Sequence, residues 1–523
     1  MNKRTRKVLS LILCALMLVS ALAGCGTAAP AASSAASSAA ESSASTEASA
    51  STEASSEAAP APAGEPYTVK WYTVAGTGPQ KNTPAVMEVL NKYLAEKTAT
   101  NIQVDLQLID WSFLDKIKLI ISSGEEFDMC FSAGWWEYQS FVAKGAFLPL
   151  NALFEEYAPK TFAKMAPAYK EGPKVNGELY AIPTEKDMAG NFGWVFNKKY
   201  VDKYNFDLST LKTWADITPM LKTIKENEPD IVPLLSGHPY AQDAYFERLG
   251  GTGIGKTFKY KDDKKVYNQY ELPEVVADIK LAHDWYVAGY TNQDAAVDNS
   301  SAPYTKAGNW FANEQQLKPG KAEEMTIGFG YELVQAQVCE PFAGTDDTMG
   351  SMAAISVTSR DKGVSAMKLI ELLHTDKFVV NTVKYGVEGV DYVKKSENVI
   401  DFPEGVTGDS SGYNINAPWM IGDQGLDYLF PAENPKKWEL MMAFNNNATI
   451  TPFLGFSFDA VPVKTELAAC ADILTKYKAL EIGTSLDPDK TLAKMLAELK
   501  SAGSEAIVNA KQTQLDAWLA AKK

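Results

Sequence analysis

Strand and helix patterns alternate where the folded part of this 523-residue chain begins. Residues 67–74 and 102–108 place apolar side chains at every second position, which is the period of a strand. Pro84 stands in the first turn of the helical segment between them, and a second helical segment, 111–123, precedes the apolar run 127–131. This β-α-β-α-β order predicts a parallel sheet covered by helices, with ligands bound at the carboxyl ends of its strands.

The rest of the chain predicts a second α/β lobe with a helical end. We expect strands at 180–183, 194–196, 326–329 and 353–357, helices at 214–225, 273–287 and 365–374, and terminal helices at 463–477, after Asp487 and after Gly503. The predicted fold class is therefore α/β, and the length allows two or three domains.

The first 66 residues are not expected to fold. Residues 1–24 have the basic start and apolar stretch of a secretory signal peptide. They end in Leu-Ala-Gly before Cys25, which resembles the bacterial lipobox and makes Cys25 the expected site of lipidation, for example by palmitate. Residues 26–66 contain 16 Ala, 11 Ser and no large apolar side chain, so we expect a disordered tether. The predicted location is the extracellular face of the cell membrane.

Composition excludes several classes of function. A net charge of −15 disfavours nucleic-acid binding, and after the signal no apolar run reaches the ~20 residues of a membrane span. Beyond Cys25, the three cysteines form no CxxC pair and are expected to be free thiols. The three histidines share no metal-ligand spacing, so neither a metal nor a cofactor is expected.

Residues 250–257 read GGTGIGKT and match the P-loop pattern letter for letter. A P-loop needs a strand before it and a helix after it, so that backbone amides face the phosphates. Here the preceding residues, 244–249, are predicted to be helical and the following ones, 258–267, to form a strand and hairpin. Because this context is inverted, we do not expect an ATP site.

Several segments together resemble the extracellular solute-binding proteins of ABC importers. This is the class of maltose-binding protein, and within it the similarity is to a Gram-positive lipoprotein branch. The segments are GEEFD at 124–128, KGAFLPL at 144–150, NGELYAIP at 176–183, FNKK at 196–199, GFSFD at 455–459 and PVK at 462–464. Each segment alone is weak evidence. The resemblance rests on the order of the segments together with the lipobox.

The resemblance implies two lobes that close on a solute, joined by three crossings of the chain. It places the crossings near 184–189, 349–354 and 447–451. Lobe 1 would then contain residues 67–185 and 355–450, and lobe 2 residues 186–354 and 451–523. The implied partners are an ABC permease and, through Cys25, the membrane; we expect a monomer.

Aromatic residues after the apolar run 127–131 are the leading ligand-binding candidates. Trp135, Trp136 and Tyr138 follow the carboxyl end of a predicted strand. Adjacent tryptophans in a loop cannot both point into one core, so at least one is expected at an exposed or cleft surface. Sugars stack their flat C–H faces on such rings, although structural packing is the alternative.

The other candidates lie in predicted loops. They are Lys81 in a glycine-containing corner, Glu185 and Asp187 at the first crossing, His238 and Tyr240 after an apolar run, Tyr331 after an expected strand, and Trp310 and Trp419 in polar surroundings. Each also fits an ordinary role, such as a plain turn, a solvated charge or core packing.

We therefore predict a protein that binds a carbohydrate, most simply an oligosaccharide, and catalyses no reaction. No HExxH motif is present, and no cysteine lies near a histidine. Paired carboxylates of a secreted glycoside hydrolase need not be close in sequence, so such an enzyme is the main alternative. A peptide, polyamine or polyol is the alternative solute.

Overall fold

The computed structural model describes residues 64–235, 241–250, 253–292, 295, 302–408 and 410–522. All of them belong to one of the chain's two units, 58–523. The expected signal peptide, Cys25 and nearly all of the tether lie outside the described residues, as do His238 and Tyr240.

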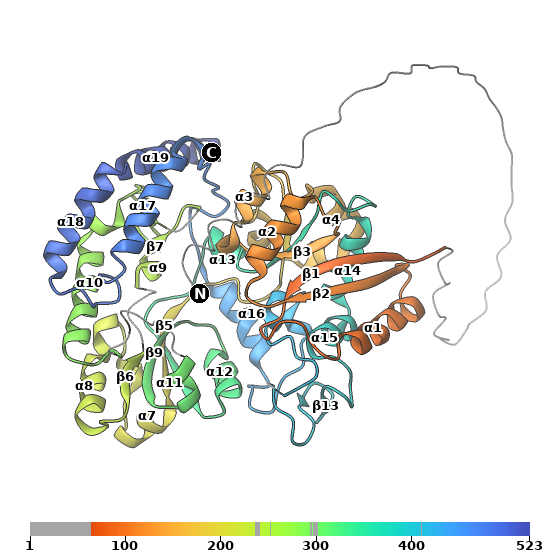
Figure 1. The fold of residues 1–523 in the computed structure, drawn as a ribbon, viewed down its shortest axis with the longest axis horizontal. Helices are drawn as coiled ribbons and strands as arrows, with labels where there is room; N and C mark the ends of the chain where they lie inside the picture. Colours follow the sequence, from red (N-terminus) through yellow and green to blue (C-terminus); the bar gives the residue numbers. More distant parts are fainter. Residues whose placement is uncertain are drawn as a thin grey trace, which may run out of the picture. The chain divides into compact units, whose positions relative to one another are not determined.

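The first sheet has the strand order β2-β1-β3-β12-β4 (Figure 1). Its strands are β1 (Tyr67–Val74), β2 (Ile102–Ile109), β3 (Met129–Ser132), β4 (Ala181–Pro183) and β12 (Met352–Ile355). β1 pairs in parallel with β2 and β3, as the sequence predicts, whereas β12 is antiparallel to both of its neighbours. α1 (Thr83–Lys97) and α2 (Phe113–Ser123) connect the parallel strands, and Gly124 ends α2 at a φ of 70°.

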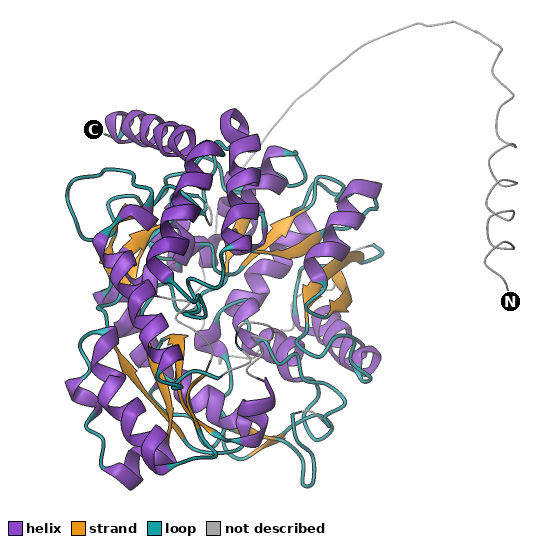
Figure 2. Ribbon diagram, turned by 60° about the vertical axis from the view of Figure 1, so that its left-hand side comes forward, coloured by secondary structure: helices purple, strands orange, loops and turns teal. Residues whose placement is uncertain are grey.

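The second sheet has the order β10-β5-β9-β6. Its strands are β5 (Phe192–Asn197), β6 (Val232–Leu235), β9 (Trp310–Gln316) and β10 (Leu333–Gln337). All six residues of β5 are buried, because helices cover this sheet (Figure 2). Trp194 of β5 anchors the packing, with ring centroids 5.4 Å from Trp214 and 6.0 Å from Trp285.

A helical layer forms a third apolar cluster. It consists of α10 (Pro273–Val287), α17 (Lys464–Lys476), α18 (Pro488–Ser501) and α19 (Ser504–Ala521), together with β7 (Phe246–Glu247) and β8 (Thr257–Phe258). The sequence predicts all four helices. Since β8 directly follows Lys256, the segment 250–257 is not followed by the helix that a P-loop requires.

The chain passes repeatedly between the two sheets. It leaves the first sheet after β4, enters the second at β5 and returns at β12. β11 (Phe342–Ala343) pairs in parallel with β15 (Thr449–Ile450), and α16 (Lys437–Asn447) runs between the two sheet-bearing parts (Figure 1). These features are those of a two-lobed α/β fold.

The remaining elements lie around these cores. They are α3 (Tyr138–Ala143), α4 (Asn151–Tyr157), α5 (Pro159–Lys164), α6 (Pro167–Glu171), α7 (Lys198–Tyr204), α8 (Thr218–Asn227), α9 (Ala241–Tyr245), α11 (Ala302–Ala307), α12 (Lys321–Phe329), α13 (Thr345–Thr348), α14 (Val364–Thr375), α15 (Lys377–Tyr385), β13 (Val393–Lys394) and β14 (Ile400–Asp401). None of the helices in the described part of the chain has the length and apolar character that a membrane crossing requires.

Two expectations about the second lobe are wrong. The predicted strand 326–329 is the last part of α12, which begins after Gly320 and ends before Gly330, both left-handed at a φ of 80°. Trp310 was expected in a polar loop, but it is the first residue of β9 and is 0% exposed. Because β9 is paired with β5 on one side and β6 on the other, the Trp310 ring is buried although polar residues lie close to it in sequence.

Candidate ligand-binding site

A cavity of about 550 Å³ draws its lining from both sheet-bearing parts. The residues around it are Gly134, Trp135, Lys186, Asp187, Ala189, Phe192, Asp243, Phe246, Glu247, Arg248, Lys259, Gln315, Gln316, Lys318, Lys321, Glu324, Asp346, Asp347, Gly350 and Trp419. It therefore has an aromatic edge, an amide-bearing edge and many charged groups.

Trp135 forms the aromatic edge. It lies in a short 3₁₀ turn, Gly134–Trp136, directly after β3, which places it at the carboxyl end of a sheet strand. Its side chain is 43% exposed, and its Nε1 donates a hydrogen bond to the Gly350 carbonyl at 2.7 Å. The Trp419 ring lies 6.4 Å away between centroids. Trp135 is thus fixed in orientation while its ring remains accessible.

Trp136 contacts its neighbour, with the two ring centroids 4.6 Å apart and their planes tilted by 50°. Its ring stacks on Phe113 with centroids 5.7 Å apart and planes 5° apart, and it meets Phe131 edge-on. It packs against the core of the first lobe and does not line the cavity. The pair therefore divides into an exposed ring and a packed one.

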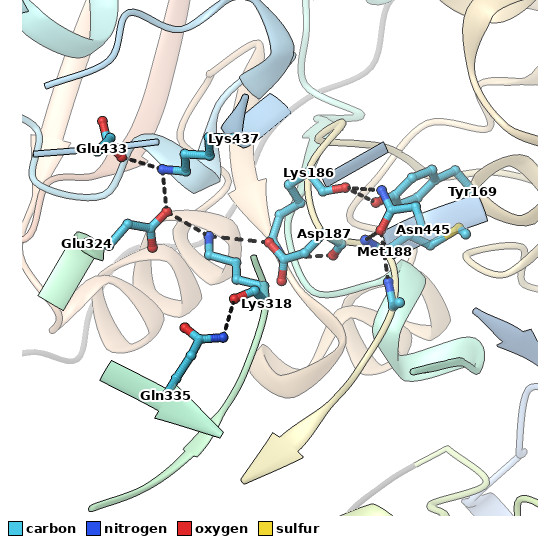
Figure 3. Close-up of polar contacts among 11 residues, drawn as sticks. Tyr169, Lys186, Asp187, Met188, Lys318, Glu324, Gln335, Glu433, Lys437 and Asn445 are labelled. Atoms are coloured by element: carbon cyan, nitrogen blue, oxygen red, sulfur yellow. Dashed lines mark hydrogen bonds and ion pairs between the residues drawn. The ribbon is translucent and has the colours of Figure 1, made fainter. Parts of the chain in front are cut away.

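An ionic network runs along one wall of the cavity (Figure 3). The Asp187 carboxylate lies 3.0 Å from Lys186 Nζ and 3.5 Å from Lys318 Nζ. Lys318 also pairs with Glu324 at 3.2 Å, and Glu324 with Lys437 of α16 at 2.7 Å. Burial by itself would raise the pKa of Asp187, but the two adjacent ammonium groups lower it to about 2. Asp187 is therefore ionised at neutral pH.

The backbone at 186–188 is held by two helices. The Lys186 carbonyl accepts hydrogen bonds from the Tyr169 hydroxyl and from Asn445 Nδ2, each at 2.8 Å (Figure 3). Asn445 Oδ1 in turn accepts the Met188 amide at 2.8 Å. These bonds tie the segment that leaves the first sheet to α6 and α16.

Carboxylates gather at another part of the cavity. Burial raises the pKa of Glu247 to about 7 and that of Asp347 to about 6. The pKa of Asp346 is also raised by burial. Glu247 is only 3% exposed, and its carboxylate accepts hydrogen bonds from the Thr345 amide and the Thr451 hydroxyl. The nearby positive charge of Lys259 lowers the pKa of all three carboxyl groups and so partly opposes the effect of burial.

Three of the residues predicted from the sequence meet at this cavity: Trp135, Asp187 and Trp419. Glu185 lies outside the lining, where it pairs with Lys164 at 3.2 Å; burial and nearby Asp423 raise its pKa to about 7. Lys81 is exposed in a turn and does not line the cavity.

The other described candidates belong to the packing of the protein. Tyr138 is 0% exposed, and its hydroxyl donates to the Pro173 carbonyl at 2.9 Å. Trp310 Nε1 donates to the Tyr331 hydroxyl at 2.8 Å, and this hydroxyl donates to the Thr305 carbonyl at 2.5 Å. Tyr331 follows a helix and not the expected strand. The structure therefore does not place these three residues in the cavity.

Several lining residues were missed by sequence reasoning. Gln315 and Gln316 end β9, and Lys318 and Lys321 follow within the next turn. The polar residues at the end of a strand were the available signal. The strands expected in the second lobe did not include β9, so this signal could not be used. Asp243 and Arg248 reach the cavity only through the packing of α9 and β7.

The cysteines and the possible metal ligands were also predicted from the sequence. Cys130, Cys339 and Cys470 are free thiols, as expected. Within the described ranges, His, Cys, Asp and Glu side chains form no group of three or more arranged to hold a metal ion.

Two α/β lobes joined by several crossings, with a cavity lined from both, define the class of two-lobed binding proteins. The chain belongs to the bacterial extracellular solute-binding proteins, whose family model matches residues 77–377. A second model, a domain of unknown function named DUF3502, matches residues 452–520, which contain the helical end. Members of the solute-binding family are not enzymes, and neither is this chain; the glycoside-hydrolase alternative is therefore wrong.

Relatives in Streptococcus pneumoniae are similar over most of the chain. A carbohydrate ABC transporter substrate-binding protein is 30% identical over 475 residues, which cover 88% of this chain and 93% of the relative. The crystal structure of an N-glycan transport solute binding protein (NgtS) matches with a TM-score of 0.77 at 27% identity, covering 87% of this chain and 100% of the other. The same protein in complex with Man1GlcNAc matches with a TM-score of 0.72 at 26% identity, covering 86% and 99%.

Proposed function

We propose that this protein captures an oligosaccharide between its two lobes and presents it to the permease of an ABC importer. The observation that carries the proposal is the position of Trp135. Its accessible ring, oriented by the bond to Gly350, edges a cavity that takes most of its other lining from the second lobe.

The chemistry of this cavity suits a sugar. A pyranose ring offers a flat C–H face to an aromatic ring and hydroxyl groups around its rim. Trp135 and Trp419 offer aromatic surface, and the amides of Gln315 and Gln316 can both donate to and accept from hydroxyls. Relatives named for carbohydrate transport, one of them crystallised with Man1GlcNAc and Man5GlcNAc, support the same class of solute.

The mechanism we infer is lobe closure. A solute that contacts Trp135 on one lobe and Gln316 on the other gains both sets of contacts only when the lobes are closed, so binding shifts the population to the closed form. We take the lobes as residues 67–185 with 355–450 and 186–354 with 451–523, except that all of β12 is assigned to lobe 1 because it pairs there. The permease would recognise the closed form, and lipid on Cys25 would hold the monomer at the membrane.

Thermal unfolding of the purified protein against matched panels tests the class of solute. One panel contains neutral and acidic oligosaccharides, and the other contains peptides, polyamines and polyols. A ligand at 100 times its dissociation constant adds ~2.7 kcal/mol to the free energy of unfolding. We expect a raised melting temperature with at least one oligosaccharide. Stabilisation by members of the second panel alone would contradict the proposal.

A further inference from the structure

Lys321 is a cation of the cavity that the protein does not neutralise. It is the first residue of α12 and lines the cavity with Gln315 and Gln316. Its ammonium has no hydrogen-bond or ion-pair partner among the described residues. The other ammonium groups on this wall are all paired.

In the adjacent ionic network every ammonium group is balanced by a carboxylate, so the charge of Lys321 is in excess. The ammonium groups of Lys186, Lys318 and Lys437 are matched by the carboxylates of Asp187, Glu324 and Glu433. Each of these carboxylates is already committed to at least one ammonium group, as Figure 3 shows. Lys321 adds a further positive charge, and no carboxylate on this wall remains for it.

The surroundings of Lys321 are unfavourable for a cation. Burial is the main cause that lowers its pKa; Lys318 and Lys186 lower it further, and Glu324 and Asp187 only partly oppose this. The first turn of a helix also disfavours positive charge, because the helix dipole is positive there. A negatively charged group bound at this position would pair with the ammonium and offset these effects.

The other charged residues of the cavity indicate where an anionic group of the solute would bind. Arg248 is paired with Asp243, and Lys259 lies against the Phe342 ring. Both are close to Glu247, Asp346 and Asp347, which would repel an anion. The wall at Lys321 is therefore the part of the cavity where an anionic group is favoured.

We propose that the solute is an acidic oligosaccharide, whose carboxylate or sulfate group pairs with Lys321 while a neutral ring stacks on Trp135. This inference rests on the proposed function. A hydrogen bond between an ammonium and an anionic group is roughly twice as strong as one between neutral groups, so the acidic group would contribute to selection among sugars.

A glycan array with matched pairs tests the inference. Each pair has one backbone in a neutral form and in a uronate-, sialate- or sulfate-bearing form. The wild type is expected to bind the acidic member of a pair about tenfold or more tightly than the neutral one. Lys321→Met should lose this preference and keep the affinity for the neutral member, whereas Lys321→Arg should retain it. Lys222→Met, which removes an exposed ammonium on α8, is the matched control and should behave as wild type.

The outcomes separate the inference from the proposed function. Equal or tighter binding of the neutral members, or a preference that survives in a folded Lys321→Met variant, overturns the inference and leaves oligosaccharide binding intact. If no glycan of either kind binds, both fail. The melting temperature of each variant shows that it is folded. If Lys321→Met does not fold, loss of the preference at high salt in the wild type decides instead.

Discussion

The carboxylate of Asp187 and the ammonium of Lys318 lie 3.5 Å apart, although one follows the first sheet and the other follows β9 of the second. Lys318 is 8% exposed and has Glu324 on its other side. An ammonium held between two carboxylates of distant segments fixes how the first crossing of the chain meets the second lobe.

Removing this ammonium should destabilise the protein strongly. In Lys318→Met the carboxylates of Asp187 and Glu324 each lose a partner, and breaking a buried ion pair in this way costs about 3–5 kcal/mol of the free energy of unfolding. Urea denaturation measures the loss. The control is Lys198→Met, whose exposed i,i+4 pair with Asp202 is worth less than ~1 kcal/mol. Similar small losses in both variants would mean that the buried pair does not hold the crossing.

Trp135 and Trp136 should respond oppositely to truncation. Trp135→Ala removes an accessible ring, so we expect binding of an oligosaccharide ligand to weaken by about tenfold or more with little change in melting temperature. Trp136→Ala removes a ring stacked on Phe113, and a packed tryptophan costs up to ~3–5 kcal/mol of stability when it is truncated. Calorimetric titration and thermal unfolding of both variants measure the two effects. Wild-type affinity in Trp135→Ala would place the stacking surface elsewhere.

The bond between Trp310 and Tyr331 should matter for stability and not for ligand binding. Tyr331→Phe leaves the buried Nε1 of Trp310 without its acceptor, which costs about 1–3 kcal/mol. Denaturation of the variant gives this loss, and a titration with ligand should give the wild-type affinity. A selective loss of affinity would return Tyr331 to the binding site.

Glu247 should make the protein less stable as the pH rises. Its pKa is about 7 in the folded state against 4.5 for an ordinary glutamate, so the folded protein holds a proton that the unfolded chain releases. The contribution to stability is complete below pH 4.5 and is lost as the pH rises through about 7. Glu247→Gln should flatten this part of the stability profile, although Asp347, with a pKa of about 6, still titrates in the same direction. Denaturation between pH 4 and 8 tests this, and an unchanged slope would contradict it.

Much of the first lobe follows from local sequence. The period of two in β1 and β2, and Gly124 at the end of α2, specify strands and a helix without any information about distant residues. The exposed position of one tryptophan at 135–136 follows from the same reasoning, because the core can accept only one of two adjacent rings.

The wall at the second lobe could not be predicted in this way. The ionic network there contains three lysines that are far apart in sequence, Lys186, Lys318 and Lys437. Their ion pairs with carboxylates depend on how the segments of the chain pack. The apolar run 326–329 has the composition of a strand, but the left-handed glycines at 320 and 330 delimit a helix instead. That error hid the start of α12, and with it Lys321.

Small-angle scattering with and without a saturating oligosaccharide tests the central claim most directly. Capture between the lobes predicts a smaller radius of gyration in the presence of ligand, because contacts to both lobes form only when they close. For Trp135→Ala, the same compaction should require about tenfold or more higher ligand concentration than for the wild type. A tightly bound, saturating oligosaccharide that leaves the wild-type scattering unchanged would contradict closure on a solute.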